Sequence, residues 1–218
     1  MRPESYRVVD WNNIEILSEC LDTKKSWRKK RDIVFARNKT YTDLTSLIEL
    51  ANHNKLSLAI YKPKRFIDLT IEPVEREWSP QKLSILDKMS KQLNLFQSPE
   101  ETKKQFKFVD KLPYKFSYKF EDKCGKRRRL MIEDWEIGAL YWHCLKRAKG
   151  NEEIALEKVR QKYWTTFTEL DTHLFLGTTK AFHGRARNPF VIIGVFPAPK
   201  ERQPSLLQYV EQPLPLMP

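Results

Sequence analysis

Residues 114–121 alternate aromatic and polar side chains, and no other feature constrains the fold of this chain as strongly. The rings are Tyr114, Phe116, Tyr118 and Phe120, and the residues between them and after them are Lys115, Ser117, Lys119 and Glu121. Successive side chains of a β-strand point to opposite faces of the sheet, so a period of two predicts a strand. This strand has one aromatic face and one charged face, and an alternating aromatic face is usually the inside of a half-buried sheet.

The residues on either side extend this strand into a larger pattern. Gly125 can turn the chain, and residues 129–133 alternate again, which predicts a hairpin. A second hairpin is predicted from residues 174–178 and 189–196, and two further strands are predicted at 56–61 and 66–71. Helices are predicted at 24–36, at 43–51, at 79–93, at 135–148 and at 152–170, with Asp134 and Asn151 as caps of the last two. Hairpins intermixed with helices indicate an α+β fold, with antiparallel hairpins packed against several helices.

Composition and breaks in the hydrophobic pattern divide the chain into four regions. With 218 residues and 40% hydrophobic content, the chain can bury a real core. Residues 1–95 are predicted to form an N-terminal region of mixed helices and strands. Residues 96–112 lack a regular hydrophobic pattern, which predicts a linker or mobile loop. Residues 113–197 form a region of hairpin, two helices and hairpin, and the proline-rich residues 198–218 form an extended tail.

Positive charge is in excess and is clustered. The chain has 40 Lys and Arg residues against 28 Asp and Glu, a net charge of +12. Clusters of this kind raise the local potential, and the commonest polyanion that binds to them is a nucleic-acid backbone. We therefore expect a non-catalytic, cytoplasmic protein that binds RNA or DNA through phosphate contacts, either alone or as one subunit of a larger complex.

Nine residues in three clusters are predicted to contact phosphates. The helix cluster is Lys29, Lys30 and Arg31, the hairpin cluster is Arg127, Arg128 and Arg129, and the loop cluster is Lys180, Arg185 and Arg187. Arginine forks match phosphate oxygens, and glycines beside the loop cluster let the backbone approach a ligand closely. Any one of these basic clusters can also be an ordinary solvent-exposed surface, so the prediction depends on the three clusters converging on one surface. If the rings are core, the opposite, charged face of the strand, with Lys115, Lys119 and Arg129, is the binding surface.

Two other functions fit parts of the sequence. Asp134 and Glu136 could hold Mg²⁺ in a metal-dependent nuclease, although Asp134 is also placed to cap a helix and Glu136 to lie in its first turn. Alternatively, the positive surface could dock an acidic protein, with the proline-rich tail as a second contact. The sequence does not choose between RNA and DNA or between single and double strands.

Several classes of protein are disfavoured. Neither a GxGxxG nor a GxxxxGK[ST] phosphate loop occurs, and the apolar runs are too short to span a membrane. The first residues have no apolar core of a secretory signal, and three widely spaced cysteines are typical of reduced thiols in a cytosol. His143 and Cys144 are adjacent, so they point apart on a helix and rarely share a zinc ion. We therefore expect no metal, no cofactor and no membrane contact.

Motifs along most of the chain resemble a widespread set of prokaryotic proteins of uncharacterised function, often found in mobile or defence-associated gene neighbourhoods. The resembling residues include Pro113–Phe116, Ile132–Glu136, Phe175–Gly177 and Pro189–Phe196. The resemblance carries no activity over to this chain, but the usual gene neighbourhood favours nucleic-acid transactions such as antiviral defence. Many relatives place a Cys/Cys/His set in the hairpin before the Asp-Trp-Glu motif. Here only Cys124 and Gly125 remain, so the resemblance implies no metal site in this chain.

Overall fold

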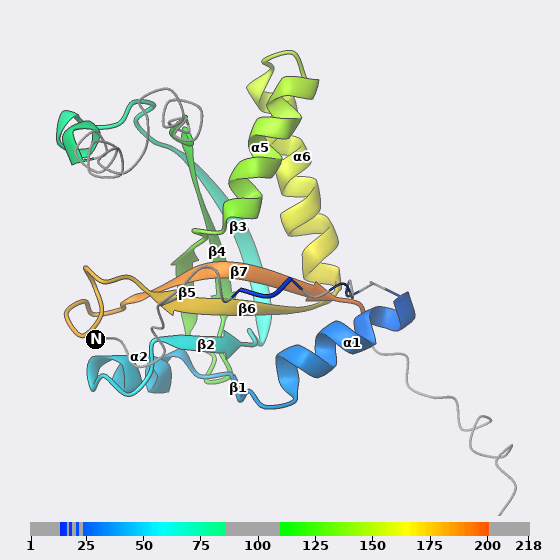
Figure 1. The fold of residues 1–218 in the computed structure, drawn as a ribbon, viewed down its shortest axis with the longest axis vertical. Coiled ribbons are helices and arrows are strands. Elements are labelled where there is room, and N and C mark those ends of the chain that lie inside the picture. Colours follow the sequence, from blue (N-terminus) through cyan, green and yellow to red (C-terminus); the bar gives the residue numbers. More distant parts are fainter. Residues whose placement is uncertain (1–13, 17, 19–20, 22–23, 86–109, 201–218) are drawn as a thin grey trace, which may run out of the picture.

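The fold is built on two β-sheets that contain strands from both halves of the chain (Figure 1). The computed structural model describes residues 14–16, 18, 21, 24–85 and 110–200. The first sheet has the order β1 (Thr40–Tyr41), β2 (Leu58–Tyr61), β6 (Asp171–Thr178) and β7 (Phe190–Ala198). The second has the order β3 (Arg65–Pro73), β4 (Tyr114–Glu121) and β5 (Arg127–Met131). Only the pair β1–β2 is parallel within these sheets.

The two sheets are joined at both sides and share one core. A short turn around Pro63 leads from β2 into β3, and an isolated parallel bridge joins Ile132, just after β5, to Ile192 of β7. Figure 1 shows the strands of one sheet crossing those of the other at a steep angle. The rings of Tyr61 and Phe120 meet in the shared core, with their centroids 5.5 Å apart.

The predicted aromatic face of β4 is core, as expected. Phe116, Tyr118 and Phe120 are at most 1% exposed. Tyr118 also donates its hydroxyl to the carbonyl of Tyr163, so its one polar atom is satisfied inside the core. These rings are therefore unavailable for stacking on a bound base.

The helices around the sheets include α1 (Lys24–Phe35), α2 (Leu44–Asn52), α5 (Trp135–Arg147) and α6 (Glu152–Arg160). Asp43 caps α2, and the predicted caps Asp134 and Asn151 begin α5 and α6, each side chain accepting from a backbone N–H of the first turn. The combination of these helices with mostly antiparallel sheets confirms the predicted α+β fold.

Some local predictions differ from the structure. Apolar spacing in the helices predicted at 24–36 and 152–170 predicts that Ile33 and Ile154 face inward, but they are 61% and 50% exposed. Of the apolar stripe predicted for the helix at 152–170, Val159 and Tyr163 are buried, and Ala155 is buried in place of Ile154. The helix predicted to run to residue 170 leaves α geometry at Gln161, continuing as a π-helix to Thr166 and then as a 3₁₀ turn over Phe167–Glu169.

The predicted N-terminal and C-terminal regions are interleaved. Strand β2 pairs with β6, and β3 pairs with β4, so residues from before and after the predicted linker share both sheets. Most of the predicted linker at 96–112 and most of the predicted tail at 198–218 lie outside the described residues. Among the described residues, no helix is both long enough and apolar enough to cross a membrane.

Candidate nucleic-acid interface

The outer face of the three-stranded sheet carries most of the charge that β3, β4 and β5 contribute. Because side chains alternate along a strand, the face opposite the buried rings holds Lys115, Ser117, Lys119 and Glu121 of β4. The register places Asp68 opposite Lys119 and Glu72 opposite Lys115 on β3. On β5 it places Arg129 opposite Lys119 and Arg127 opposite Glu121. Three of these four cross-strand pairs join opposite charges, and the fourth, Lys119 with Arg129, joins two cations.

Each of the three carboxylates on this face is shared by two cations. Glu121 accepts from Lys64 Nζ at 2.7 Å and from Arg65 Nε at 2.8 Å. Asp68 lies 3.9 Å from Lys119 Nζ and 3.8 Å from an Nη of Arg160. Glu72 lies 3.3 Å from Lys115 Nζ and also pairs with Arg129. Pairing therefore fixes the cations in place but cannot neutralise them all.

Arg127 adds a further cation to these six. It is exposed, and no partner for it is found within the part of the chain that the structure describes. We call the resulting surface the cationic face, which consists of seven basic residues and three acidic ones: Lys64, Arg65, Lys115, Lys119, Arg127, Arg129 and Arg160, with Asp68, Glu72 and Glu121. Seven positive charges against three negative ones leave an excess of four.

Two carboxylates of the cationic face, those of Glu72 and Glu121, are held in their charged form. Hydrogen bonds from Arg129 and then Lys115 lower the pKa of Glu72 below its ordinary value. Those from Lys64 and Arg65 lower the pKa of Glu121 in the same way. At neutral pH the face therefore keeps a constant arrangement of charges, with the positive sign dominant.

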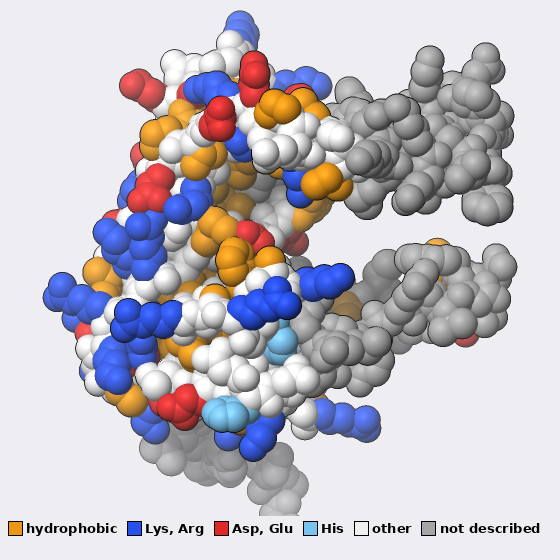
Figure 2. All heavy atoms as spheres, turned by 90° about the vertical axis from the view of Figure 1, so that its left-hand side faces the viewer, with side chains coloured by type: hydrophobic (Ala, Val, Ile, Leu, Met, Phe, Trp, Pro, Cys, Tyr) orange, Lys and Arg blue, Asp and Glu red, His pale blue; other side chains and the backbone are white. Residues whose placement is uncertain are grey.

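The positive charge is visible on the surface of the molecule. Figure 2 shows the side that lies at the left of Figure 1, where Lys and Arg side chains gather on the left and in a band across the middle. Asp and Glu side chains are fewer among them. An arrangement of this kind raises the potential above the surface and attracts polyanions.

The three residues of the hairpin cluster have different roles. Arg127 is exposed, and Arg129 lies on the cationic face paired with Glu72. Arg128 points inward instead: its Nε donates to the fully buried Asp122 at 2.9 Å, and its Nη2 donates to Thr45 at 2.6 Å. Arg128 therefore ties the β4–β5 turn to the start of α2 and has a structural role.

The helix cluster is partly engaged within the protein. Arg31 donates to Asp171 and to the carbonyl of Pro199, both at 3.1 Å, and its side chain is only 15% exposed. Lys30 Nζ lies 5.0 Å from the ring centroid of Trp27, and Lys29 is exposed on the same helix. Arg31 thus anchors α1 to the first residue of β6 and is a structural residue.

The loop cluster is exposed on a loop that is held at its base. Lys180, Arg185 and Arg187 are all exposed between β6 and β7. His183 bridges Thr178 and Asn54, with hydrogen bonds of 2.9 Å and 2.8 Å, so the loop is fixed to the end of α2. The loop is therefore fixed where it leaves the sheet, and its cations are exposed to solvent, as is common for binding loops.

The structure does not bring the three clusters together. Arg31 contacts the first residue of β6, whereas the loop cluster follows the last residue of that strand. Figure 1 shows α1 and the β6–β7 loop at opposite ends of the first sheet. The helix and loop clusters are therefore separated by the length of a strand, and the convergence expected from the sequence does not occur.

Three residues of the cationic face were not predicted from the sequence. Lys64, Arg65 and Arg160 lie outside every predicted cluster and reach the face only through the turn before β3 and the end of α6. The alternation in β4 and β5 did identify Lys115, Lys119 and Arg129 as members of one face, and the register confirms that grouping.

The acidic pair proposed for a nuclease has a structural role. Asp134 caps α5 and accepts from the backbone N–H of Glu136 at 2.9 Å, while Glu136 is exposed in the first turn. Within the described residues, no group of three or more His, Cys, Asp or Glu is arranged to hold a metal ion. The turn containing Cys124 is held by Asp122, which accepts from the backbone N–H of Lys126 at 2.9 Å.

Comparison with known proteins places the chain in a family but supplies no activity. Residues 37–212 match a domain of unknown function (DUF8757). The chain belongs to this family. The match spans all seven strands and includes the cationic face and the loop cluster. Searches of curated proteins and of solved structures returned no match.

Proposed function

We propose that this protein binds nucleic acid non-catalytically, through phosphate contacts made by the cationic face. The observation that carries the proposal is the sharing of each carboxylate between two basic side chains, with Arg127 in addition. Because each carboxylate can neutralise only one cation, four positive charges remain for an external anion. The charges come mainly from paired strands, which present them as a rigid array.

The chemistry of the array suits a phosphate backbone. Lys115 and Lys119 have side chains that are 41% and 46% exposed, so their ammonium groups can reach a ligand without unfolding the sheet. Lysine and arginine supply most of the phosphate contacts in nucleic-acid complexes. Since the ion pairs already restrict these side chains, binding costs less conformational entropy than it would for free lysines. The exposed loop cluster is a second surface of the same charge, and its variants can be tested separately.

The test measures the binding of a labelled oligonucleotide to a variant in which each carboxylate of the cationic face keeps at least one basic partner. In Lys115→Gln/Lys119→Gln/Arg127→Gln, Glu72 retains Arg129, Asp68 retains Arg160, and Glu121 retains Lys64 and Arg65. The excess charge falls from four to one. At about 0.5–1 kcal/mol for each exposed contact, affinity should fall by on the order of tenfold to hundredfold.

The control removes the same charge from another part of the molecule. Lys146, Arg147 and Lys149 are exposed at the far end of α5, away from both sheets (Figure 1). Their triple substitution to Gln should change affinity by less than about threefold, the effect of net charge alone. Equal losses in the two variants would show that binding follows net charge and has no defined site. No binding by the wild-type protein to RNA or DNA at low salt would refute the proposal.

A further inference from the structure

The outer face of the first sheet is only partly covered by α1. Trp27 and Phe35 of that helix pack on Phe196 of β7, with ring centroids 5.5 and 5.9 Å away, and Phe35 also lies 4.7 Å from the ring of His173. Beyond these contacts the helix and the sheet leave a groove of about 610 Å³. Figure 1 shows α1 below the first sheet, with α5 and α6 above it.

The lining of the groove is apolar and open to solvent. Leu58 of β2, Phe175 of β6 and Ile193 of β7 contribute to it from the sheet, and Ile33 contributes from α1. Ile33, Leu58 and Ile193 are 61%, 45% and 44% exposed. A Cβ added to Gly177 would meet the side chain of Ile193 at 3.0 Å, so the glycine lets that side chain lie close to the sheet. Exposed aliphatic side chains gathered in one groove are typical of an interaction surface.

The charges that line the groove are of one sign. Arg37, just after α1, and Lys39, just before β1, contribute to the lining, and no Asp or Glu of the described residues does. Lys39 Nζ lies 4.9 Å from the ring centroid of Tyr41, and Asn38 donates to the carbonyl of Val34 at 2.8 Å, which fixes the end of α1. The groove therefore presents an apolar surface next to two cations.

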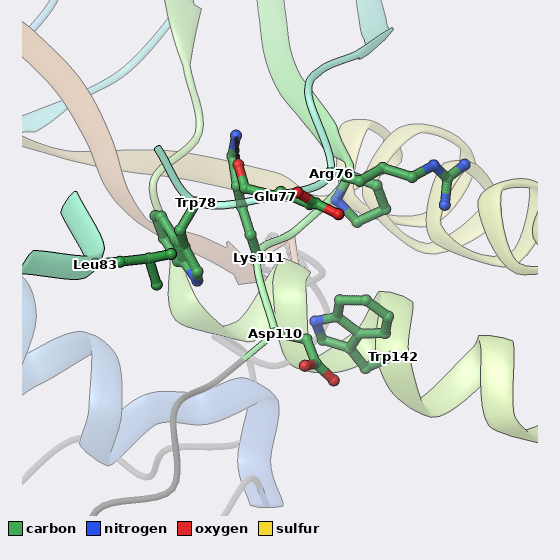
Figure 3. Close-up of a pocket in the computed structure, with 8 residues that line it drawn as sticks. Arg76, Glu77, Trp78, Leu83, Asp110, Lys111 and Trp142 are labelled. Atoms are coloured by element: carbon green, nitrogen blue, oxygen red, sulfur yellow. Dashed lines mark hydrogen bonds between the residues drawn. The ribbon is translucent and has the colours of Figure 1, made fainter. Parts of the chain in front are cut away.

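The pocket drawn in Figure 3 differs from the groove. It has a volume of about 450 Å³, and two basic and two acidic residues line it: Arg76, Lys111, Glu77 and Asp110. Arg76 donates to Glu152 at 2.7 and 2.9 Å, and Tyr114 donates its hydroxyl to Glu152 at 2.6 Å. These hydrogen bonds, with that of Arg76 the largest cause, hold the pKa of Glu152 at about 2. The mixed charges of this pocket select for neither sign, whereas those of the groove select for anionic groups.

We propose that the groove binds a segment of another protein in which carboxylate side chains flank apolar ones. The apolar side chains of that segment pack on Ile33, Leu58 and Ile193, and its carboxylates pair with Arg37 and Lys39. The groove shares no residue with the cationic face. The proposal is therefore independent of the nucleic-acid binding proposed above.

Charge and openness favour this partner over others. A nucleic-acid strand presents phosphates along its whole length, whereas the lining of the groove is mainly apolar. A second copy of the chain also carries a net charge of +12, which is unfavourable beside Arg37 and Lys39. A small apolar ligand needs an enclosed site, and the exposure of Ile33, Leu58 and Ile193 shows that this groove is open.

The test uses two labelled peptides with leucine at the same positions, one with glutamate and the other with lysine between the leucines. By fluorescence polarisation, the wild-type protein should bind the glutamate peptide on the order of tenfold more tightly than the lysine peptide. Arg37→Glu/Lys39→Glu should reverse this preference. The matched control, Lys146→Glu/Arg147→Glu, makes the same change of charge at the far end of α5 and should keep the preference.

The apolar part of the groove is tested at exposed positions, where substitution leaves the core intact. Ile33→Gln and Leu58→Thr should each weaken binding of the glutamate peptide roughly fivefold to tenfold, with an unchanged circular dichroism spectrum. Replacing the leucines of the peptide by serine should weaken its binding to the wild type by on the order of tenfold or more.

Three results would overturn the inference: no binding of the glutamate peptide, equal binding of the two peptides, or an unchanged preference in Arg37→Glu/Lys39→Glu. Stronger peptide binding by Leu206→Ser/Leu207→Ser would also overturn it, because the groove would then belong to the C-terminal segment of the same chain. A dimer in light scattering that Leu58→Thr dissociates would assign the groove to a second copy instead.

Discussion

Replacing Asp122 by Asn should destabilise the protein far more than Glu72→Gln on the cationic face. The Asp122 carboxylate is 0% exposed and accepts from Arg128 Nε and from the backbone N–H of Lys126, each at 2.9 Å. Arg128 also donates to Thr45, and the backbone N–H of Lys123 donates to the carbonyl of Thr42. The substitution removes the anionic partner of a guanidinium group whose side chain is only 21% exposed.

The expected magnitude follows from these contacts. Breaking a buried pair by removing one partner costs about 3–5 kcal/mol. Asn can still accept from the Lys126 N–H, and Arg128 keeps its bond to Thr45, so we expect about 2–3 kcal/mol at neutral pH. Glu72→Gln removes the acceptor of an ion pair whose partners are about 40% exposed, and should cost less than about 1 kcal/mol.

Urea unfolding followed by circular dichroism measures both values. A double-mutant cycle of Asp122→Asn with Arg128→Met should give a coupling free energy of about 2 kcal/mol, because each partner leaves the other unsatisfied. A coupling below about 0.5 kcal/mol would refute the reasoning, since Arg128 would then be free of a structural role and available to a ligand.

Two further predictions concern Glu152 and Gly125. The pKa of Glu152 is held at about 2, against an ordinary value of 4.5, so its contribution to stability is present above about pH 4.5 and is lost as the pH falls toward 2. Glu152→Gln should therefore be less stable than the wild type at neutral pH, and acid unfolding curves should show this difference closing near pH 2. Gly125 has φ +76°, and no heavy atom lies within 4 Å of an added Cβ. Gly125→Ala should therefore cost only the backbone strain, about 1 kcal/mol in a urea titration, and a stabilised variant would contradict the assignment.

Local signals in the sequence predict the elements of this fold well. The period-two alternation identifies β4 and its buried rings, and the caps Asp134 and Asn151 give the starts of two helices. Strand β1 has two residues, which is too short for a periodic signal. The pairing of β2 with β6 joins residues more than a hundred positions apart, and nothing local specifies such a contact.

The candidate site is less predictable, because clustering in the sequence does not show which carboxylate a cation will contact. Arg31, for example, contacts Asp171, 140 positions away. The inward orientation of Arg128 could have been read from the alternation, since Arg128 lies on the same face as the buried Leu130. Arg160 gave no such signal, because it reaches the cationic face from the end of a helix.

The salt dependence of nucleic-acid binding tests the central claim most directly. If each of the four excess charges neutralises one phosphate of a single strand, log K should fall with log[salt] at a slope of about −3. In Lys115→Gln/Lys119→Gln/Arg127→Gln, where one excess charge remains, the slope should be about −1. A wild-type slope near zero, or a variant slope equal to that of the wild type, would contradict the account.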